Sequence, residues 1–177
     1  MDQPAMLRDS PPERTEAADY YFRYIDLVPR GDICETLHMQ LGDTVGMLQR
    51  IKEERSNYRY APGKWSIREV VSHINDTERL FVFRAFWFAR GFDTELPSFD
   101  QEVAASHAGA NARPWTSHIE EFQSVRTATL DFFRHLPQDA WLRRGIASGN
   151  PFTVRALAYV AAGHVIHHTK ILHERYL

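Results

Sequence analysis

The sequence contains a single cysteine, Cys34, among 177 residues. One cysteine excludes an internal disulfide and is typical of a reducing cytoplasm, where we expect a buried, inert thiol. Long apolar runs are also missing, because Arg, His or Lys interrupts every apolar stretch before the ~20 residues that a membrane span requires. The opening stretch MDQPAMLRDSPPERTE has no apolar core of the kind found in signal peptides. We therefore expect a cytoplasmic protein without a membrane partner.

An excess of positive charge is lacking as well. The formal net charge is -2 with histidine counted neutral, so the chain has no surplus of cations to neutralise phosphates. A nucleic acid is therefore not expected as a partner. Strand-like alternation is also nearly absent, and the length suits one domain with a substantial core.

What the sequence does contain is helical periodicity. We predict an all-α fold with a frayed tail over residues 1–19 and one four-helix domain over residues 20–177. The aromatic run beginning at Tyr20 predicts a short helix or turn across one end of the bundle. The long helices are predicted by breakers, capping residues and apolar spacing. They run from Asp32 to about Arg55, from Ser66 to Gly91, from the Ser117 region to Pro137, and from Thr153 to the C-terminus.

A long irregular stretch separates the second and third helices, between Arg90 and Trp115. A loop beyond ~12–15 residues is uncommon in a compact domain and is often functional. A connection of this length can cross the full height of a bundle and leave its flanking helices parallel, which predicts a four-helix bundle with one long crossover. Phe99 and Asp100 in this loop are candidates for a lid.

Histidines provide the candidate site. His164 and His168 are four residues apart in the last helix, so they share one face with core residues. A buried imidazole needs a partner, which can be a metal ion or a hydrogen-bonding carboxylate or carbonyl. Zinc and similar ions need a third ligand, and His73 in the second helix is the best candidate. His167 points about 100° away from His168, toward a pocket mouth or the surface.

The stretch PGKWSIREVVSHINDTERLFVFRA resembles the DinB/YfiT-like family of four-helix metalloproteins, in the branch with a W-S-I-x-E-V-x-x-H-x-x-D-T-E signature. SVRTATLDFFRHL and the final GNPFTVRALAYVAAGHVIHHTKILHERYL are similar to the same branch. The resemblance implies a divalent ion, zinc or nickel most often, held by His73, His164 and His168. It also draws attention to the D-T-E triplet, in which Asp76 and Glu78 are candidates to orient the metal ligands, together with His167. Either carboxylate could instead form a salt bridge with Arg79 or Arg84.

Three neutral imidazoles leave an ion with its full charge and an open coordination position, as in catalytic sites. Such an ion can activate water for hydrolysis or bind a thiol as the thiolate. The residue after His164 is Val165, so the general base of an HExxH protease is missing from its usual place. Members of the family attach low-molecular-weight thiols to electrophiles, and others are described as metal-dependent hydrolases. We favour thiol transfer to a small-molecule substrate, because a thiolate needs no dedicated protein base.

The alternative is a non-catalytic, metal-bearing interaction module. The aromatic stretch FVFRAFWFAR cannot bury all of its rings at once, so the long loop or a second subunit must cover Phe83, Phe86 or Trp87. A homodimer is therefore expected.

Overall fold

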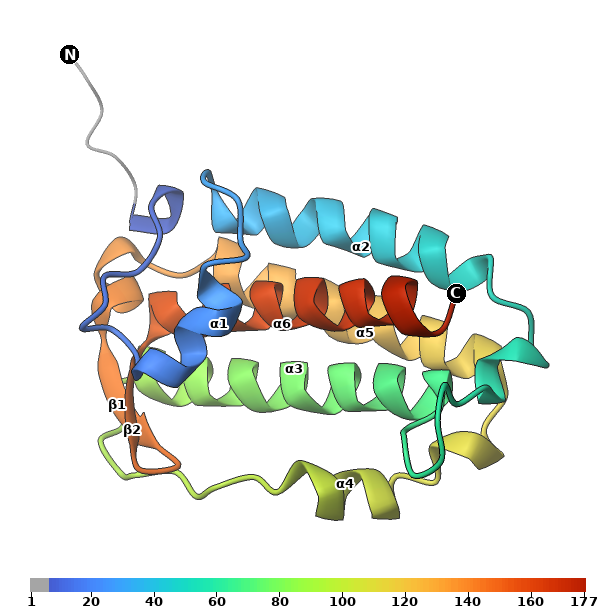
Figure 1. The fold of residues 1–177 in the computed structure, drawn as a ribbon. Coiled ribbons are helices and arrows are strands. Elements are labelled where there is room, and N and C mark those ends of the chain that lie inside the picture. The colour runs from blue at the N-terminus through green and yellow to red at the C-terminus, as the bar shows by residue number, and fades with distance from the viewer. Residues whose placement is uncertain (1–6) are drawn as a thin grey trace.

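The computed structural model describes residues 7–177 and shows four long helices packed side by side (Figure 1). The long helices are α2 (Ile33–Gln49), α3 (Ile67–Ala89), α5 (Trp115–Arg134) and α6 (Val154–Arg175). Helices α3 and α5 run in the same direction, and α2 and α6 run opposite to them (Figure 1). The predicted four-helix bundle with one long crossover is confirmed. Within residues 7–177, none of the helices is long and apolar enough to cross a bilayer.

Local capping chemistry defines most helix starts. Asp32 accepts a hydrogen bond from the Cys34 amide at the start of α2. Ser66 and Glu69 form the predicted capping box of α3, and Thr153 caps α6 by accepting from the Ala156 amide. Cys34 is buried, as predicted, and burial raises the pKa of its thiol to about 11.

Two predicted helix limits were wrong. Helix α5 begins at Trp115, directly after Pro114, rather than at a cap formed by Ser117. The Ser117 hydroxyl instead donates to the Pro114 carbonyl, and proline suits the entry to a helix because its φ is already fixed. The first long helix ends at Gln49, and its expected extension to Arg55 is replaced by turns with a short 3-10 helix at Arg55–Asn57.

A β-hairpin was missed. Strands β1 (Arg144–Ala147) and β2 (Asn150–Thr153) pair antiparallel through a two-residue turn. Ser148 and Gly149 both have positive φ, as the tight hairpin turns that suit twisted strands require. The hairpin precedes α6 and contacts two distant segments, since β2 forms a bridge with Ala17 and β1 forms one with Leu96.

The prediction of a frayed tail over residues 1–19 was wrong for its described part, and residues 1–6 lie outside the described residues. Glu16 is buried and accepts from Arg155 Nε at 3.0 Å and from the Thr153 hydroxyl at 2.7 Å. These contacts anchor the N-terminal segment to the start of α6. The short helix α1 (Phe22–Ile25) packs across α6, as the aromatic run predicted.

The crossover between α3 and α5 contains the helix α4 (Gln101–His107) and a 3-10 turn at Ala110–Ala112. Asp100 caps α4 by accepting from the amides of Glu102 and Val103.

The predicted homodimer stays a prediction. Phe83 and Phe86 are 48% and 39% exposed, whereas the Trp87 indole stacks on Phe92 within the chain.

A buried ion pair joins three of the long helices. Arg126 on α5 is fully buried and donates to both carboxylate oxygens of Glu78 on α3, at 2.7 and 2.8 Å. Its other nitrogen donates to the Leu37 carbonyl and the Gln40 side chain on α2. Because both charges are out of water, each depends on the other for stability.

We therefore expect Arg126→Met to lower the free energy of unfolding by about 3–5 kcal/mol, since Glu78 would be left as an unpaired buried charge. Chemical denaturation measures this loss. Arg79→Met is the control: Arg79 is half exposed in its pairs with Asp76 and Glu121, so its loss should be below about 1 kcal/mol. The double variant Glu78→Leu with Arg126→Met should recover part of the loss. Equal effects of the Arg126 and Arg79 variants would contradict the assigned role.

Candidate metal centre

The three predicted ligands lie on two helices that pack against each other. His73 is in the N-terminal third of α3 and is only 5% exposed. His164 and His168 are one turn apart on α6; His164 is equally buried and His168 is half-buried. Because α3 packs along α6, the face of α6 that carries both histidines is directed toward His73.

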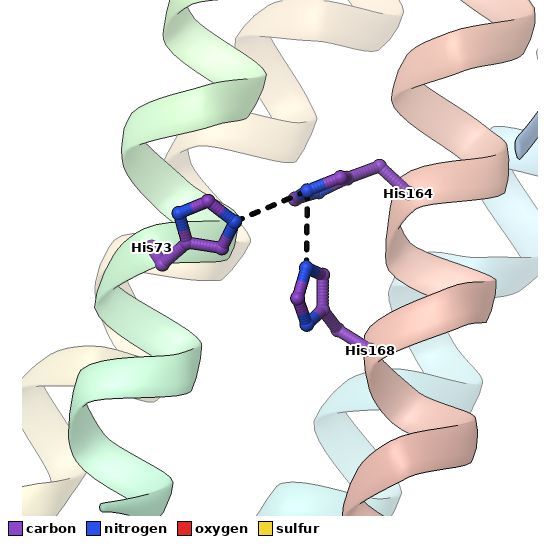
Figure 2. Close-up of side chains that lie close together, drawn as sticks. All are labelled: His73, His164 and His168. Atoms are coloured by element: carbon purple, nitrogen blue, oxygen red, sulfur yellow. Dashed lines mark hydrogen bonds between the residues drawn. The ribbon is translucent and has the colours of Figure 1, made fainter. Parts of the chain in front are cut away.

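The three imidazoles converge at one point (Figure 2). His164 Nε2 lies 3.2 Å from His73 Nε2 and 3.1 Å from His168 Nε2. One nitrogen from each of the three rings falls within 4.8 Å of the other two, so the cluster could hold a metal ion. The prediction that these three residues from separate segments meet in space is therefore confirmed.

Thr77 sets the tautomer of His164. The Thr77 hydroxyl has one proton and donates it to the His73 carbonyl at 2.7 Å. Its oxygen can then only accept from His164 Nδ1, which lies 3.3 Å away. With the proton on Nδ1, His164 Nε2 presents a lone pair to the other two rings, as a metal ligand must.

Burial keeps all three rings neutral. Desolvation, followed by the charge of His167, lowers the pKa of His73 to about 4. Desolvation, with contributions from His73 and His167, lowers the pKa of His168 to about 3. The pKa of His164 falls well below its usual value for the same reason, with His168 as the next cause. Neutral imidazole is the form that binds metal ions, so the electrostatic environment fits that use.

The carboxylate candidates have other partners. Both oxygens of Glu78 accept from Arg126, so Glu78 does not orient the histidines. Asp76 lies 3.5 Å from Arg79, the salt bridge considered as its alternative. Thr77, between them in the D-T-E triplet, makes the contact instead. The sequence could have indicated this contact, because Thr77 lies one helical turn after His73 and therefore on the same face of the helix.

His167 lies beside the cluster without joining it. Its ring packs edge-on against Tyr24 and has its centroid 5.0 Å from that of His168. Tyr24 also packs against His164. This approach of α1 to α6 requires Gly163, since a Cβ there would lie 2.1 Å from the Tyr24 carbonyl oxygen.

Two cavities border the histidines. The first, of about 130 Å³, is lined by His73 and His164, together with Tyr24, Phe81 and the loop residue Phe99. The second, of about 280 Å³, is lined by His168 and by the aromatic side chains of Trp65, Tyr60 and Tyr176. Gln101 at the start of α4 lines both cavities.

No fourth protein ligand joins the cluster among residues 7–177: the group contains three histidines and neither a carboxylate nor a thiol. Structural zinc sites are normally closed by four protein ligands, whereas catalytic sites use three and keep one position open. The donor set therefore fits a divalent ion, which His73, His164 and His168 would hold beside the two cavities.

The fold of this chain is similar to that of two solved structures. One similar structure is YfiT from Bacillus subtilis, which is described as a probable metal-dependent hydrolase with an unusual four-helix bundle topology. The two structures superpose with a TM-score of 0.68 at 13% identity, over 92% of this chain and 91% of YfiT. A mycothiol-dependent maleylpyruvate isomerase superposes with a TM-score of 0.63 at 12% identity, over 77% of this chain and 58% of the isomerase. Identities this low establish the shared fold alone.

Curated proteins give no match. The sequence profile of the DinB superfamily, in contrast, matches residues 36–172, a span that includes all three histidines of the cluster and most of the four-helix bundle. The chain therefore belongs to the DinB superfamily.

Proposed function

We propose that His73, His164 and His168 bind a divalent metal ion, zinc or nickel, and that the protein is a metal-dependent enzyme acting on a small molecule by thiol transfer. The observation that carries this proposal is the convergence of three neutral imidazole nitrogens within 4.8 Å of one another, with no fourth protein ligand among the described residues. A divalent ion at such a site supplies a Lewis acid that binds a thiol as the thiolate.

The surrounding residues support thiol chemistry. Hydrolysis benefits from a general base placed beside the ion, but Glu78 is occupied by Arg126 and Asp76 pairs with Arg79. A thiolate needs no such base. Thr77 holds the tautomer of His164, and the rings of Tyr24 and Phe81 shield one side of the cluster from water.

Metal-dependent hydrolysis is the second candidate. It is favoured by the fold shared with YfiT, which is described as a probable metal-dependent hydrolase. The likeness to a mycothiol-dependent isomerase favours the thiol-based alternative. Turnover of model electrophiles with and without added low-molecular-weight thiols separates the two: thiol-independent cleavage of esters or amides would favour hydrolysis.

Metal retention depends on the three clustered histidines. We expect untagged protein to retain about one equivalent of metal, and His73→Ala or His168→Ala to reduce this at least tenfold, because two ligands hold an ion far less tightly than three. Elemental analysis by mass spectrometry measures the content. His173→Ala is the matched control, since His173 is exposed on the same helix. A similar loss in all three variants would break the assignment.

The pH dependence of metal affinity provides another test. Because the pKa is about 4 for His73 and about 3 for His168, protons should compete with the metal only as the pH falls toward 4. Metal affinity, measured by competition with a chelator, should therefore change little between about pH 7 and pH 5. Histidines with an ordinary pKa near 6.5 would instead lose affinity steadily below that pH.

The same pKa shifts make the metal-free protein sensitive to acid. The folded state keeps His73 neutral down to about pH 4, whereas the unfolded chain takes up a proton near pH 6.5. Between these values the unfolded state binds more protons, so the free energy of unfolding should decrease as the pH falls from about 6.5 to 4. Denaturation of wild type and His73→Gln checks this, and the variant should show the shallower slope.

A further inference from the structure

Four arginines are buried in the described chain, and one of them differs from the others. Three form salt bridges with carboxylates: Arg68 with Glu53, Arg126 with Glu78 and Arg155 with Glu16. Arg84 is 2% exposed and has no Asp or Glu within salt-bridge distance among residues 7–177. A buried charge without a counterion is costly, so this arginine requires an explanation.

The contacts of Arg84 do not neutralise it. Its Nη2 donates to the Pro97 carbonyl at 3.1 Å and to the Ser148 hydroxyl at 2.8 Å, and the Tyr21 hydroxyl also interacts with the guanidinium. All three groups are uncharged oxygens. Its Nε is buried without a hydrogen-bond partner. Desolvation lowers the pKa of Arg84, yet a guanidinium remains protonated in proteins, so one positive charge stays uncompensated.

Arg84 lines the same cavity as His73 and His164. It follows His73 by three turns on α3 (84 − 73 = 11 residues), which is about 16 Å along the helix axis. Residues eleven apart on an α-helix lie on nearly the same face, so Arg84 and His73 can border one cavity. The lining of the cavity therefore combines a cation, two of the three clustered histidines and several aromatic side chains.

The charge of the cavity favours an anion of low charge. No Asp or Glu is found among the described residues that line it, and Arg84 is its only arginine or lysine there. One guanidinium balances one carboxylate, and the N–H groups of Arg84 other than those of Nη2, which donate to Pro97 and Ser148, can donate charge-assisted hydrogen bonds to it. In the metal-free protein, a phosphate monoester, which carries about -1.5 to -2 charges near neutral pH, would exceed this single cation.

We propose that the substrate is an elongated small molecule with a carboxylate, which Arg84 binds while the opposite end of the molecule reaches His73 and His164. The assignment of that opposite end as the reacting one rests on the proposed function. Arg84 is thus a specificity residue for the substrate, and the substrate carboxylate supplies the counterion that Arg84 lacks among the described residues.

Titration calorimetry on protein freed of metal by a chelator tests the anionic subsite alone. Hexanoate should bind saturably to wild type, and Arg84→Gln should weaken it at least tenfold, whereas the neutral hexanamide should bind both proteins equally. Arg79→Gln, a half-exposed arginine on the same helix, is the matched control and should leave hexanoate affinity unchanged. Equal hexanoate affinity in wild type and Arg84→Gln would overturn the proposal. Arg84-dependent binding of inorganic phosphate tighter than that of hexanoate would overturn the carboxylate assignment.

Arg84→Lys is a second variant that keeps the proposal testable if Arg84→Gln does not fold. It keeps the charge but lacks the planar guanidinium with its fixed donor directions, so it should bind hexanoate more weakly than wild type and more tightly than Arg84→Gln. An affinity equal to that of wild type would contradict recognition by the planar guanidinium. Melting curves confirm folding, and Arg84→Gln should destabilise the protein less than Arg126→Met, because it leaves no carboxylate unpaired.

His168→Ala separates this proposal from the metal-dependent function. It removes a proposed metal ligand that lies outside the first cavity, so hexanoate affinity in the metal-free state should be unchanged. If hexanoate binds through Arg84 but the protein retains no metal, the proposed function fails and the anionic subsite stands. If metal is retained but hexanoate binding does not depend on Arg84, the subsite fails alone.

Discussion

The hydrogen bond between the Thr77 hydroxyl and His164 Nδ1 links the fold to the site. It lies in the interface of α3 and α6, and its direction is fixed because Thr77 already donates to the carbonyl of His73. One hydroxyl thereby contacts the backbone of one candidate ligand and the ring of another. The histidine cluster is thus a consequence of how these two helices pack, and any change in their register would separate the rings.

The sequence could predict features that depend on local or periodic interactions. Asp32, Ser66 and Thr153 cap helices through neighbours within three residues, so their sequence spacing was sufficient. His164 and His168 share a face because of the helical period, and His73 was predicted as their partner from its place in the second helix and then by the resemblance. The length of the crossover was enough to predict that α3 and α5 run parallel.

Features that depend on distant contacts could not be predicted. The N-terminal segment is held by Glu16, whose partner Arg155 is 139 residues away in the sequence. The hairpin is short and gains bridges to Ala17 and Leu96, which no local pattern reveals. The same limit applies to Arg84: charge content does not show which of the buried arginines lacks a carboxylate, since every pairing crosses between separate elements.

Two cavities border the histidine cluster, and Gln101 at the first turn of α4 lines both. Helix α4 is carried by the crossover that the parallel arrangement of α3 and α5 makes necessary. A displacement of this one short helix would alter the two openings together. Access to both cavities would then depend on one segment, because the connectivity of the chain places the same short helix beside each of them.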